Sequence, residues 1–484
     1  MLSLYNTLSK KKEVFESPKD GPIRLYTCGP TVYDYVHIGN LRSYVAADTL
    51  RRVLEASGLE VRHVKNITDV GHLTADDIAQ GDSGEDKIAK KALAEHKSPA
   101  EIAAFYTDYY RQAEATLNIL PAHIEPHATE YVPQMITFIN GLIGSGHAYK
   151  KNGNVFFDVR SFDKYGALSG NTLEKLKVGA RLEEHPDKRN PWDFALWLKA
   201  PEGHLMHWDS PWGVGYPGWH IECSAMNLAT LGPTIDIHTG GEDNIFPHHE
   251  AEIAQSECGN GVPFARYWIH TRHLLVDGQK MSKSKGNFYR LEDIIERGYS
   301  AMDLRMLFLS AHYRSQMNFT WEALAQAKKN KESLVGVINR LQTLEIRDSK
   351  AKENNVYPEE LDNPNGLDGS DYLSNIQKAV DDDLNTSESL SLALELSRKV
   401  NAALDSNELV KISVLKDVFK KIFFLFGLTV EDLVIPETIQ SIVKARQTAR
   451  EKKDFARSDA LRDEIAALGY AVEDGPEGQT VRKR

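Results

Sequence analysis

The chain has 484 residues, of which 41% are hydrophobic and 26% charged, so it is globular in composition and long enough for roughly three domains. No apolar run reaches the roughly 20 residues that a membrane-spanning helix needs, and residues 1–18 are polar and lack the apolar core of a secretion signal. The net charge of −11 argues against nonspecific binding of polyanions by the whole surface.

The three cysteines stand far apart, at positions 28, 223 and 258. They do not form the framework of a disulfide-stapled protein, so we expect a reducing, cytoplasmic setting. The charge is uneven, because residues 441–484 carry 10 Lys and Arg against 8 Asp and Glu in an otherwise acidic chain. A basic end on an acidic body permits one directed contact with a nucleic acid.

Residues 1–120 predict a βαβ unit. Residues 22–27 and 60–67 resemble buried parallel strands, and the amphipathic stretch 41–56 predicts a helix between them. We expect a Gly- and Asp-rich loop over 71–86, and helical periodicity continues from 85 to 120. In an open parallel sheet, ligands bind where such strands end and helices begin.

Residues 121–205 predict an insertion, with a helix at 131–145 and antiparallel strands at 154–159 and 195–199. The nucleotide-binding fold resumes over 206–319. The elements expected there are a helix at 224–231, a strand at 234–238, a helix at 248–257, a strand at 267–275 and a turn at Asp277-Gly278.

Residues 320–430 predict a bundle of amphipathic helices at 321–343, 372–404 and 410–425, with an exposed loop over 354–371. The last domain, 431–484, follows a break at Pro436 and is expected to hold one basic amphipathic helix, 441–468, and a short tail. The predicted fold class is α/β. A Rossmann-like parallel-sheet catalytic domain with an inserted connective domain is followed by an α-helical bundle and a small C-terminal domain.

The segment from Cys28 to Asn40 joins the first predicted strand to the first predicted helix and reads Cys-Gly-Pro-Thr-Val-Tyr-Asp-Tyr-Val-His-Ile-Gly-Asn. A helix start offers unpaired N–H groups and a positive dipole end to a phosphate. Gly39 permits close approach of a nucleotide to the backbone. We therefore expect an ATP-phosphate site beside Cys28.

A second segment, Lys280-Met281-Ser282-Lys283-Ser284, places two lysines three residues apart between Gly278 and Gly286. Two ammonium groups that close over a triphosphate would stabilise the charge that builds up during nucleotidyl transfer. Taken alone, such a run of Lys and Ser is more often a solvated loop.

His37-Ile38-Gly39-Asn40 and the Lys280 segment together resemble the two signature motifs of class I aminoacyl-tRNA synthetases. Within that class, Asn in the last place of the first motif, preceded by Cys28-Gly29-Pro30-Thr31-Val32-Tyr33, resembles the cysteinyl-tRNA synthetase family. The resemblance covers nearly the whole chain and continues through residues 66–69, 218–226, 246–255, 379–386 and 457–463.

The resemblance implies that L-cysteine is activated by ATP, with Mg²⁺, to cysteinyl-adenylate and then transferred to the 3′ end of tRNA(Cys). It implies a monomeric enzyme in which no residue becomes covalently attached. The implied catalytic residues are His37, Asn40, Lys280 and Lys283. The implied ATP-binding residues are His37, Gly39, Asn40, Gly241, Asp243 and Lys283, and the implied substrate-binding residues are Cys28, Gly29, Thr68 and Trp219.

Four residues form a candidate metal set. His248 and Glu252 are four positions apart and share one helix face, while Cys28 and Cys223 are each expected beside a strand end or turn. Two thiolates, one imidazole and one carboxylate suit tetrahedral zinc. Spacing alone favours the other interpretation, two buried free cysteines beside an ion pair on a helix face. The resemblance implies one zinc ion per chain at the floor of the amino-acid pocket.

Selectivity explains why such an enzyme would use zinc. An apolar pocket separates near-isosteres such as cysteine and serine by only about 1–3 kcal/mol. Zinc binds a thiolate tightly, and a serine hydroxyl is a poor ligand for it. A separate editing domain is then unnecessary, and the insertion shows no obvious hydrolytic domain.

Other residues keep two interpretations. Trp219 walls the cysteine pocket or belongs to the core. Thr68 contacts substrate or caps a strand end. Asp243 binds ribose hydroxyls or completes a turn. His249 supports the metal ligand or is exposed, and Cys258 is a free thiol without a partner.

The resemblance implies that the C-terminal domain reads the anticodon GCA by stacking and edge hydrogen bonds. Its basic helix carries Arg446, Arg450, Arg457 and Arg462. The alternative interpretation is that these arginines form a solvated helix face without a partner. Two departures from the family are the long 71–86 loop and Val481, which stands where Trp is common.

Two rival functions remain at this point. One is a ligase that joins activated cysteine to a small amino-sugar, although such enzymes lack the full C-terminal regions. The other is a non-catalytic zinc- and RNA-binding paralogue, which the intact His37, Asn40, Lys280 and Lys283 argue against.

Overall fold

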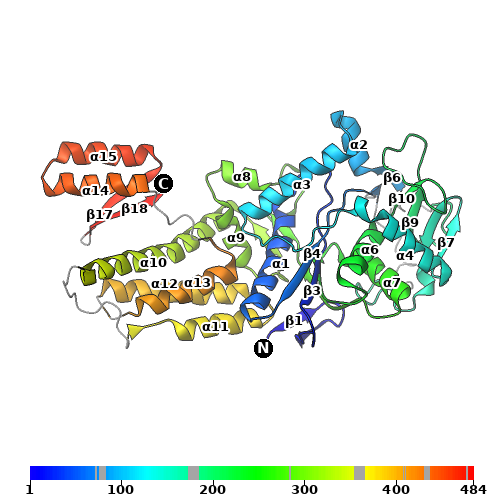
Figure 1. Cartoon of the computed structure of the whole chain (residues 1–484), viewed down its shortest axis with the longest axis horizontal. Helices are drawn as coiled ribbons and strands as arrows, with labels where there is room; N and C mark the ends of the chain where they lie inside the picture. The colour runs from blue at the N-terminus through cyan, green and yellow to red at the C-terminus, as the bar shows by residue number, and fades with distance from the viewer. Residues whose placement is uncertain are drawn as a thin grey trace.

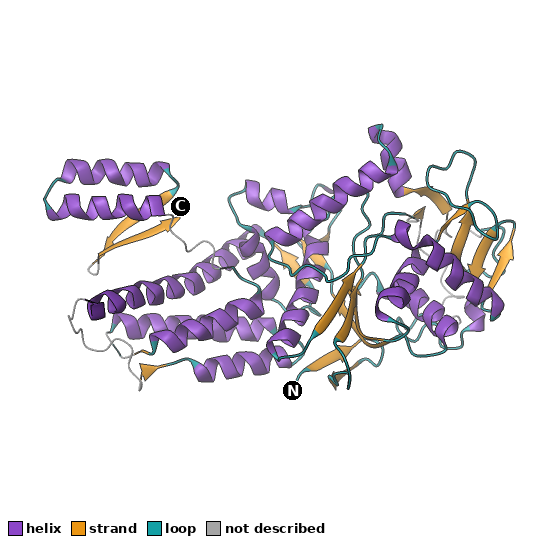
Figure 2. Cartoon of the chain, in the orientation of Figure 1, coloured by secondary structure: helices purple, strands orange, loops and turns teal. Residues whose placement is uncertain are grey.

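The computed structural model describes residues 1–70, 73–75, 83–172, 185–282, 285–353, 366–406, 408, 410–429, 437–475 and 478–483. Figure 1 shows an elongated molecule with a parallel sheet near its centre, a helical bundle on the left and a mixed insertion on the right. A small C-terminal unit lies above the end of the bundle, and Figure 2 shows that it contains both helices and strands. Among the described residues, no helix combines the length and apolar character needed to cross a bilayer.

The central sheet has four parallel strands in the order β12-β11-β3-β4. Its strands are β3 (Ile23–Thr27), β4 (Val61–Lys65), β11 (Ile235–Gly241) and β12 (Ala265–Thr271). Helix α1 (Ile38–Ala56) connects β3 to β4 and confirms the predicted βαβ unit. A short antiparallel pair, β1 (Ser3–Asn6) and β2 (Lys11–Val14), precedes the sheet.

The segment after β4 differs from the prediction. Part of the expected loop pairs as two short antiparallel strands, β5 (Leu73–Ala75) and β6 (Ser83–Asp86). The expected helix over 85–120 is two helices, α2 (Lys87–Glu95) and α3 (Pro99–Thr116). It breaks because His96 is left-handed, with φ of 54°, and Ser98 begins a new helix with a capping box to Glu101.

The insertion packs helices against an antiparallel sheet in the order β10-β9-β8-β7. Its strands are β7 (Ala148–Lys151), β8 (Asn154–Phe157), β9 (Phe194–Lys199) and β10 (Gly215–Pro217). Its helices are η1 (Ala128–Tyr131), α4 (Val132–Gly144) and η2 (Val159–Ser161). The predicted helix and the two predicted antiparallel strands are thus confirmed, and β7 and β10 are two strands that were not predicted.

The second half of the parallel-sheet region contains α6 (Trp219–Leu231), the π-helical turn η3 (Ile245–His249) and α7 (Glu250–Asn260). The predicted strand 267–275 is two strands, because the chain leaves the parallel sheet after Thr271 and enters a second sheet with the order β14-β13-β15. The bounds of this sheet are β13 (Leu274–Val276), β14 (Gln279–Lys280) and β15 (Met317–Phe319). Helices α8 (Leu291–Glu296) and α9 (Ala301–Leu309) lie between β14 and β15.

The predicted helical bundle is confirmed, with one helix more than expected. Its members are α10 (Trp321–Glu353), α11 (Ser370–Asp381), α12 (Thr386–Asp405) and α13 (Ile412–Phe426). The expected 372–404 helix is broken at Asp383 and Leu384, whose φ angles are 62° and 55°. Most of the loop predicted over 354–371 lies outside the described residues.

The C-terminal unit is a helical hairpin and a β-hairpin in place of one helix and a tail. It consists of α14 (Glu437–Glu451), α15 (Phe455–Ala467), β17 (Tyr470–Gly475) and β18 (Gly478–Lys483). The chain turns at Lys453, with φ of 62°, and the Asp454 side chain accepts from the backbone N–H of Arg457 and caps α15. Arg446 is buried, so it does not belong to the exposed basic face predicted for this region. Val481 pairs with Val472 in the β-hairpin, and Pro436 lies outside the described residues.

Candidate functional site

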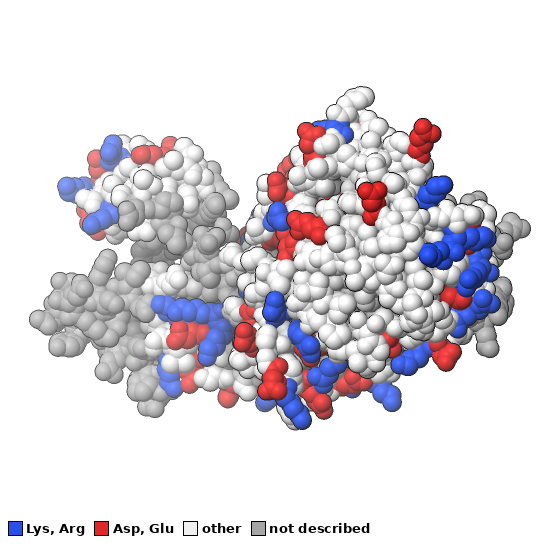
Figure 3. All heavy atoms as spheres, turned by 45° about the vertical axis from the view of Figure 1, so that its right-hand side comes forward, with Lys and Arg blue, Asp and Glu red and all other residues white. Residues whose placement is uncertain are grey.

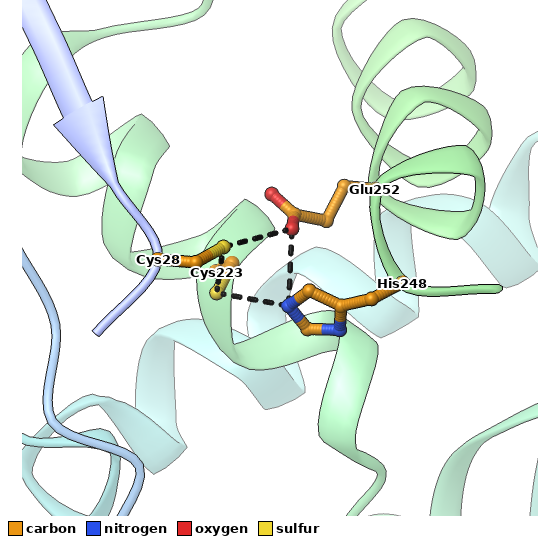
Figure 4. Close-up of side chains that lie close together, drawn as sticks. All are labelled: Cys28, Cys223, His248 and Glu252. Carbon is orange, nitrogen blue, oxygen red and sulfur yellow. Dashed lines mark hydrogen bonds and ion pairs between the residues drawn. The ribbon is translucent and has the colours of Figure 1, made fainter. Parts of the chain in front are cut away.

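Four side chains from separate parts of the chain converge at the carboxyl end of β3. Figure 4 shows Cys28, Cys223, His248 and Glu252, which together form the metal cluster, pointing toward one another. Cys28 follows β3 and donates its backbone N–H to the Thr239 carbonyl of β11, 3.1 Å away. Cys223 lies inside α6, where the sequence predicted a strand end or turn. His248 lies in the last turn of η3 and Glu252 in the first turn of α7, so the expected shared face is present across a π-to-α junction.

The distances within the metal cluster suit a small tetrahedral cation. The sulfurs of Cys28 and Cys223 are 4.0 Å apart, and Sγ of Cys223 is 3.4 Å from Nε2 of His248. Oε1 of Glu252 lies 3.1 Å from that nitrogen and 3.6 Å from Sγ of Cys28. Zinc bond lengths of about 2.0–2.3 Å in a tetrahedron give ligand-to-ligand separations of about 3.3–3.8 Å. All four ligand atoms lie within 4.8 Å of one another, so the residues present fit a zinc ion.

Burial makes the anionic forms of these groups costly. Burial raises the pKa of Cys28, and the neighbouring Cys223 raises it further; burial also raises the pKa of Cys223. The Glu252 carboxylate is fully buried beside them. A divalent cation at their centre would reverse this cost and favour both thiolates.

Further histidines surround the metal cluster. Nε2 of His238 lies 2.9 Å from Oε2 of Glu252, and Nδ1 of His220 lies 2.9 Å from Nδ1 of His248. His249 is buried, so its predicted exposed alternative is wrong. Its Nε2 is 3.2 Å from Sγ of Cys28 and its Nδ1 is 2.8 Å from Nε2 of His270. Contacts of this kind fix the orientation of metal-binding side chains.

The sequence prediction missed three of these histidines, namely His220, His238 and His270. A signal was available for one of them, because His238 lies on the predicted strand 234–238, which β11 confirms. His238, His249, Cys28 and Glu252 also form a second group whose ligand atoms lie within 4.8 Å of one another. This group shares Cys28 and Glu252 with the metal cluster, so the two groups belong to one site.

The predicted substrate residues line the same region. The Trp219 ring stacks on the His248 ring, with centroids 4.2 Å apart, and is half-buried rather than part of the core. Thr68 is buried, and its Oγ1 accepts a hydrogen bond from Nδ2 of Asn66 at 3.1 Å. Gly29 lies against the backbone of Asn66, where an added Cβ would come within 1.6 Å of the carbonyl oxygen. Gly29 therefore has a clear packing role.

The first signature segment caps α1. The backbone N–H of Asn40 donates to Nδ1 of His37 at 3.1 Å, and the N–H of His37 donates to Oδ1 of Asn40 at 3.2 Å. This capping box explains why the helix begins at Ile38, earlier than predicted. Since Nδ1 accepts, the neutral His37 ring carries its proton on Nε2 and can donate from there to an anion.

The second signature segment lies beside the first. The Ile38 N–H donates to the Tyr289 carbonyl at 3.0 Å, and the His37 ring packs edge-on against Phe288. A Cβ on Gly39 would come within 2.9 Å of the His37 ring and 3.4 Å of the Met281 methyl. Lys280 is exposed at the end of β14, after the predicted turn at Asp277-Gly278, which is confirmed. Lys283 lies outside the described residues.

Gly241 and Asp243 stand where β11 ends. The Gly241 N–H donates to Oδ1 of Asn244 at 2.9 Å, and Asp243 is exposed. The neighbouring Gly240 lies against His249, where a Cβ would come within 2.7 Å of the ring. This stretch therefore borders the metal site on one side and solvent on the other.

Among the described residues, exposed charges of one sign do not cover the face drawn in Figure 3. On the face drawn in Figure 3, Lys and Arg gather along the right-hand edge and acidic side chains are scattered over the upper part. Arg450, Arg457 and Arg462 are exposed on α14 and α15. A polyanion would therefore meet local basic sites on an acidic molecule.

Three family models together match most of the chain. Residues 14–329 match the tRNA synthetases class I (C) catalytic domain. Residues 375–431 match the DALR domain, and residues 434–482 match the Cysteinyl-tRNA ligase anticodon binding domain.

Full-length relatives agree with these matches. The chain is 41% identical to the cysteine–tRNA ligase of Chlamydia caviae over 493 residues, which covers 100% of this chain and 98% of that protein. It is also 41% identical to the cysteine–tRNA ligase of Chlorobaculum tepidum over 505 residues, covering 100% and 99%. Among solved structures, methionyl-tRNA synthetase of Mycobacterium tuberculosis with methionyl-adenylate superposes with a TM-score of 0.59. That match covers 90% of this chain and 96% of the other at 14% identity, and it shows a shared fold.

Proposed function

Since this chain belongs to the cysteine–tRNA ligase family, it joins cysteine to tRNA at the expense of ATP, and we propose that the residues around Cys28 and the start of α1 carry out the reaction. The relatives align over the whole length of the chain. The anticodon-binding match over residues 434–482 favours tRNA over a small amino-sugar as the acceptor.

We propose that the metal cluster holds one zinc ion. The observation that supports it is the convergence of two sulfurs, one imidazole nitrogen and one carboxylate oxygen within 4.8 Å in a buried pocket. An ion held by these four residues would supply affinity for a thiolate, which the cysteine substrate can offer and serine cannot. Trp219 and Thr68 would border the amino-acid pocket beside it.

We propose that ATP, with Mg²⁺, binds along the start of α1. His37 would donate from Nε2 to a phosphate, Asn40 and the helix N–H groups would add further donors, and Gly39 leaves room for the nucleotide. Asp243, exposed at the end of β11, would accept from the ribose hydroxyls. Gly241 allows the backbone to approach the adenosine.

In the first step, a carboxylate oxygen of cysteine attacks the α-phosphorus and the bond to pyrophosphate breaks. Lys280 and Lys283 would stabilise the negative charge that develops on the leaving pyrophosphate. In the second step, a hydroxyl of the terminal adenosine of tRNA attacks the acyl carbon and AMP leaves. These residues act by positioning and charge, and none of them becomes acylated.

We further propose that the enzyme is a cytoplasmic monomer that reads the anticodon with its C-terminal unit. The exposed arginines of α14 and α15 would contact phosphates there. Size-exclusion chromatography with light scattering checks the monomer, for which a mass near 54.4 kDa is expected.

The zinc proposal is tested by measuring metal per chain together with cysteine-dependent pyrophosphate exchange, before and after chelation. We expect about one zinc per chain, loss of exchange when zinc is removed, and recovery when zinc is returned. Serine should support little exchange in the zinc form. Full cysteine-dependent exchange in metal-free protein, or preference for serine, would refute the proposed role of the cluster.

A further inference from the structure

Arg42, two residues after Asn40 in α1, has a buried guanidinium with only backbone carbonyls as its hydrogen-bond acceptors among the described residues. The residue is 2% exposed. Its Nη1 donates to the carbonyls of Arg272 and His273 at 2.6 and 3.2 Å. Its Nη2 donates to the carbonyls of His312 and Ser315 at 3.2 and 2.7 Å. One side chain thus holds two separate chain segments against the helix that begins with the first signature segment.

Both segments lead into the sheet that carries Lys280. Residues 272–273 join β12 to β13, and residues 312–315 lead to β15. β13 pairs with β15 on one side and with β14, which ends at Lys280, on the other. The tight Asp277-Gly278 turn between β13 and β14 fixes the hairpin further, because both residues have positive φ, as a two-residue type I′ turn requires.

The stretch Gly241–Asp243, which is proposed to bind the adenosine, contacts residues 271–273 as well. Glu242, which stands between Gly241 and Asp243, accepts from the His273 N–H at 2.7 Å and from Nη1 of Arg272 at 2.7 Å. The Glu242 N–H donates to the Thr271 carbonyl at 2.9 Å. Residues 271–273 are therefore tied to the β11 end through Glu242 and to α1 through Arg42.

We propose that Arg42 is a positioning residue for adenylate formation, which sets the distance between the first signature segment and the hairpin that presents Lys280. This inference rests on the proposed roles of His37, Asn40 and Lys280. Arginine suits the task because its planar fork reaches four acceptors in fixed directions. Lysine is a flexible point charge with three donors and cannot hold both segments in register.

The test compares Arg42→Lys and Arg42→Gln with Arg52→Lys. Arg52 lies on the same helix, is 3% exposed, and donates to the carbonyls of Asn118 and Phe424 at 2.6 and 3.2 Å. It faces the helical bundle instead of the hairpin, so it is a matched control for the loss of a buried guanidinium. Thermal unfolding, zinc content, and kcat and KM for cysteine-dependent pyrophosphate exchange are measured for each variant.

For Arg42→Lys we expect kcat to fall on the order of 10- to 100-fold, because small misplacements of reacting groups have effects of this size. KM for cysteine and the zinc content should stay within twofold of the unsubstituted enzyme. Arg52→Lys should lower the unfolding temperature yet keep kcat within twofold. Arg42→Gln gives the same comparison if Arg42→Lys does not fold.

Three outcomes would overturn the inference. They are a kcat within twofold in folded Arg42 variants, an equal loss of kcat in Arg52→Lys, and failure of both Arg42 variants to fold while Arg52→Lys folds. Lys280→Ala separates this inference from the proposed function. A lower kcat in Lys280→Ala without a lower kcat in Arg42→Lys rejects the Arg42 role alone. An unchanged kcat in Lys280→Ala rejects the proposed role of Lys280, and with it the reason for Arg42 to position the hairpin.

Discussion

Cys223 is 1% exposed in the second turn of α6, with its sulfur facing the His248 imidazole. Serine at this position keeps nearly the same volume but offers zinc a poor, largely protonated ligand. We expect Cys223→Ser to remain folded, to lose at least 10-fold in zinc affinity, and to lose cysteine-dependent exchange with it.

Metal content after dialysis against a graded chelator measures this change. Cys258→Ser is the matched control, because that thiol lies outside the metal cluster and packs against the surrounding core. Full retention of zinc by Cys223→Ser would contradict the ligand assignment.

Gly29 shows a role that the resemblance did not predict. A methyl group at this position would come within 1.6 Å of the Asn66 carbonyl, and the Gly29 N–H donates to Oδ1 of Asn66 at 2.9 Å. Gly29→Ala must therefore push the ends of β3 and β4 apart. We expect a loss of about 1–3 kcal/mol in the free energy of unfolding, as for other overpacked sites, measured by urea denaturation. Gly58→Ala, where no atom lies within 4 Å but φ is 78°, is expected to cost less, and equal losses would contradict the packing role.

The residue types of the site could be predicted from the sequence, but most of their contacts could not. Cys28, Cys223, His248 and Glu252 were identified by type and by resemblance, and they do converge. The histidines at positions 220 and 270 were missed because they approach the metal cluster only through the order of the strands and the packing of α6. Chain spacing carries no information about such contacts.

At the scale of elements, α1 is joined to α9 and α13 by buried charges. Asp48 forms ion pairs with Arg52 on its own helix and with Arg305 on α9. Arg305 also donates to the Phe426 carbonyl at the end of α13, at 2.6 Å. Burial by itself raises the pKa of Asp48, but the charges of Arg305 and Arg52 outweigh it and hold that pKa below its ordinary value.

Asp48→Asn should destabilise the protein by about 3–5 kcal/mol, because it leaves two buried guanidinium groups without their counter-charge. The carboxylate's contribution is fully present above the ordinary Asp pKa of about 3.9. It disappears as the pH falls through the lower pKa of the folded state. The difference in free energy of unfolding between the unsubstituted protein and Asp48→Asn, measured with urea, should therefore be largest near pH 7 and shrink below about pH 4.

Asp382→Asn is the control, because its ion pair with Lys12 is exposed and such pairs contribute little. If the difference in free energy of unfolding between the unsubstituted protein and Asp48→Asn grows toward acid pH, the ion pair does not stabilise the fold.

Helices were predicted well in their amphipathic stretches and poorly at their breaks. The breaks at His96, at Asp383-Leu384 and at Lys453 all use residues other than glycine in the left-handed region. No glycine or proline stands at these positions, and only the first is closely followed by a proline, so composition favours a continuous helix at the other two. Tertiary contacts hold the turn instead, as when Asp383 accepts from the Tyr5 N–H and the Tyr313 hydroxyl.

At the scale of the whole molecule, the C-terminal unit lies apart from the parallel sheet in Figure 1. Replacing the exposed Arg457 and Arg462 by Ala should therefore lower kcat/KM for tRNA charging and leave cysteine-dependent exchange unchanged. The salt dependence of tRNA binding should become shallower, by about 0.7 in the log–log slope for each single-strand phosphate that the variant no longer neutralises.

Lys420→Ala combined with Lys421→Ala, both exposed on α13 of the bundle, serves as a charge-matched control. An equal loss of exchange in the double arginine variant, or unchanged charging near physiological salt, would contradict an anticodon-side role for these arginines.

The order of the large parts could be predicted because each has its own periodicity: strands with helices, then long amphipathic helices, then a basic end. The boundaries at 120, 205, 319 and 430 stay a prediction. The order of strands in the sheet could not be predicted, because β11 enters between β12 and β3 from a segment far along the chain.

That strand order has a consequence during synthesis. Cys28 and Glu252 are 224 residues apart, which a ribosome takes roughly 10–45 s to translate at about 5–20 residues per second. Until β11 emerges, the inner edge of β3 has no neighbour, and His248 and Glu252 emerge only after β11. The four side chains of the metal cluster can therefore first come together only when more than half of the chain has been made.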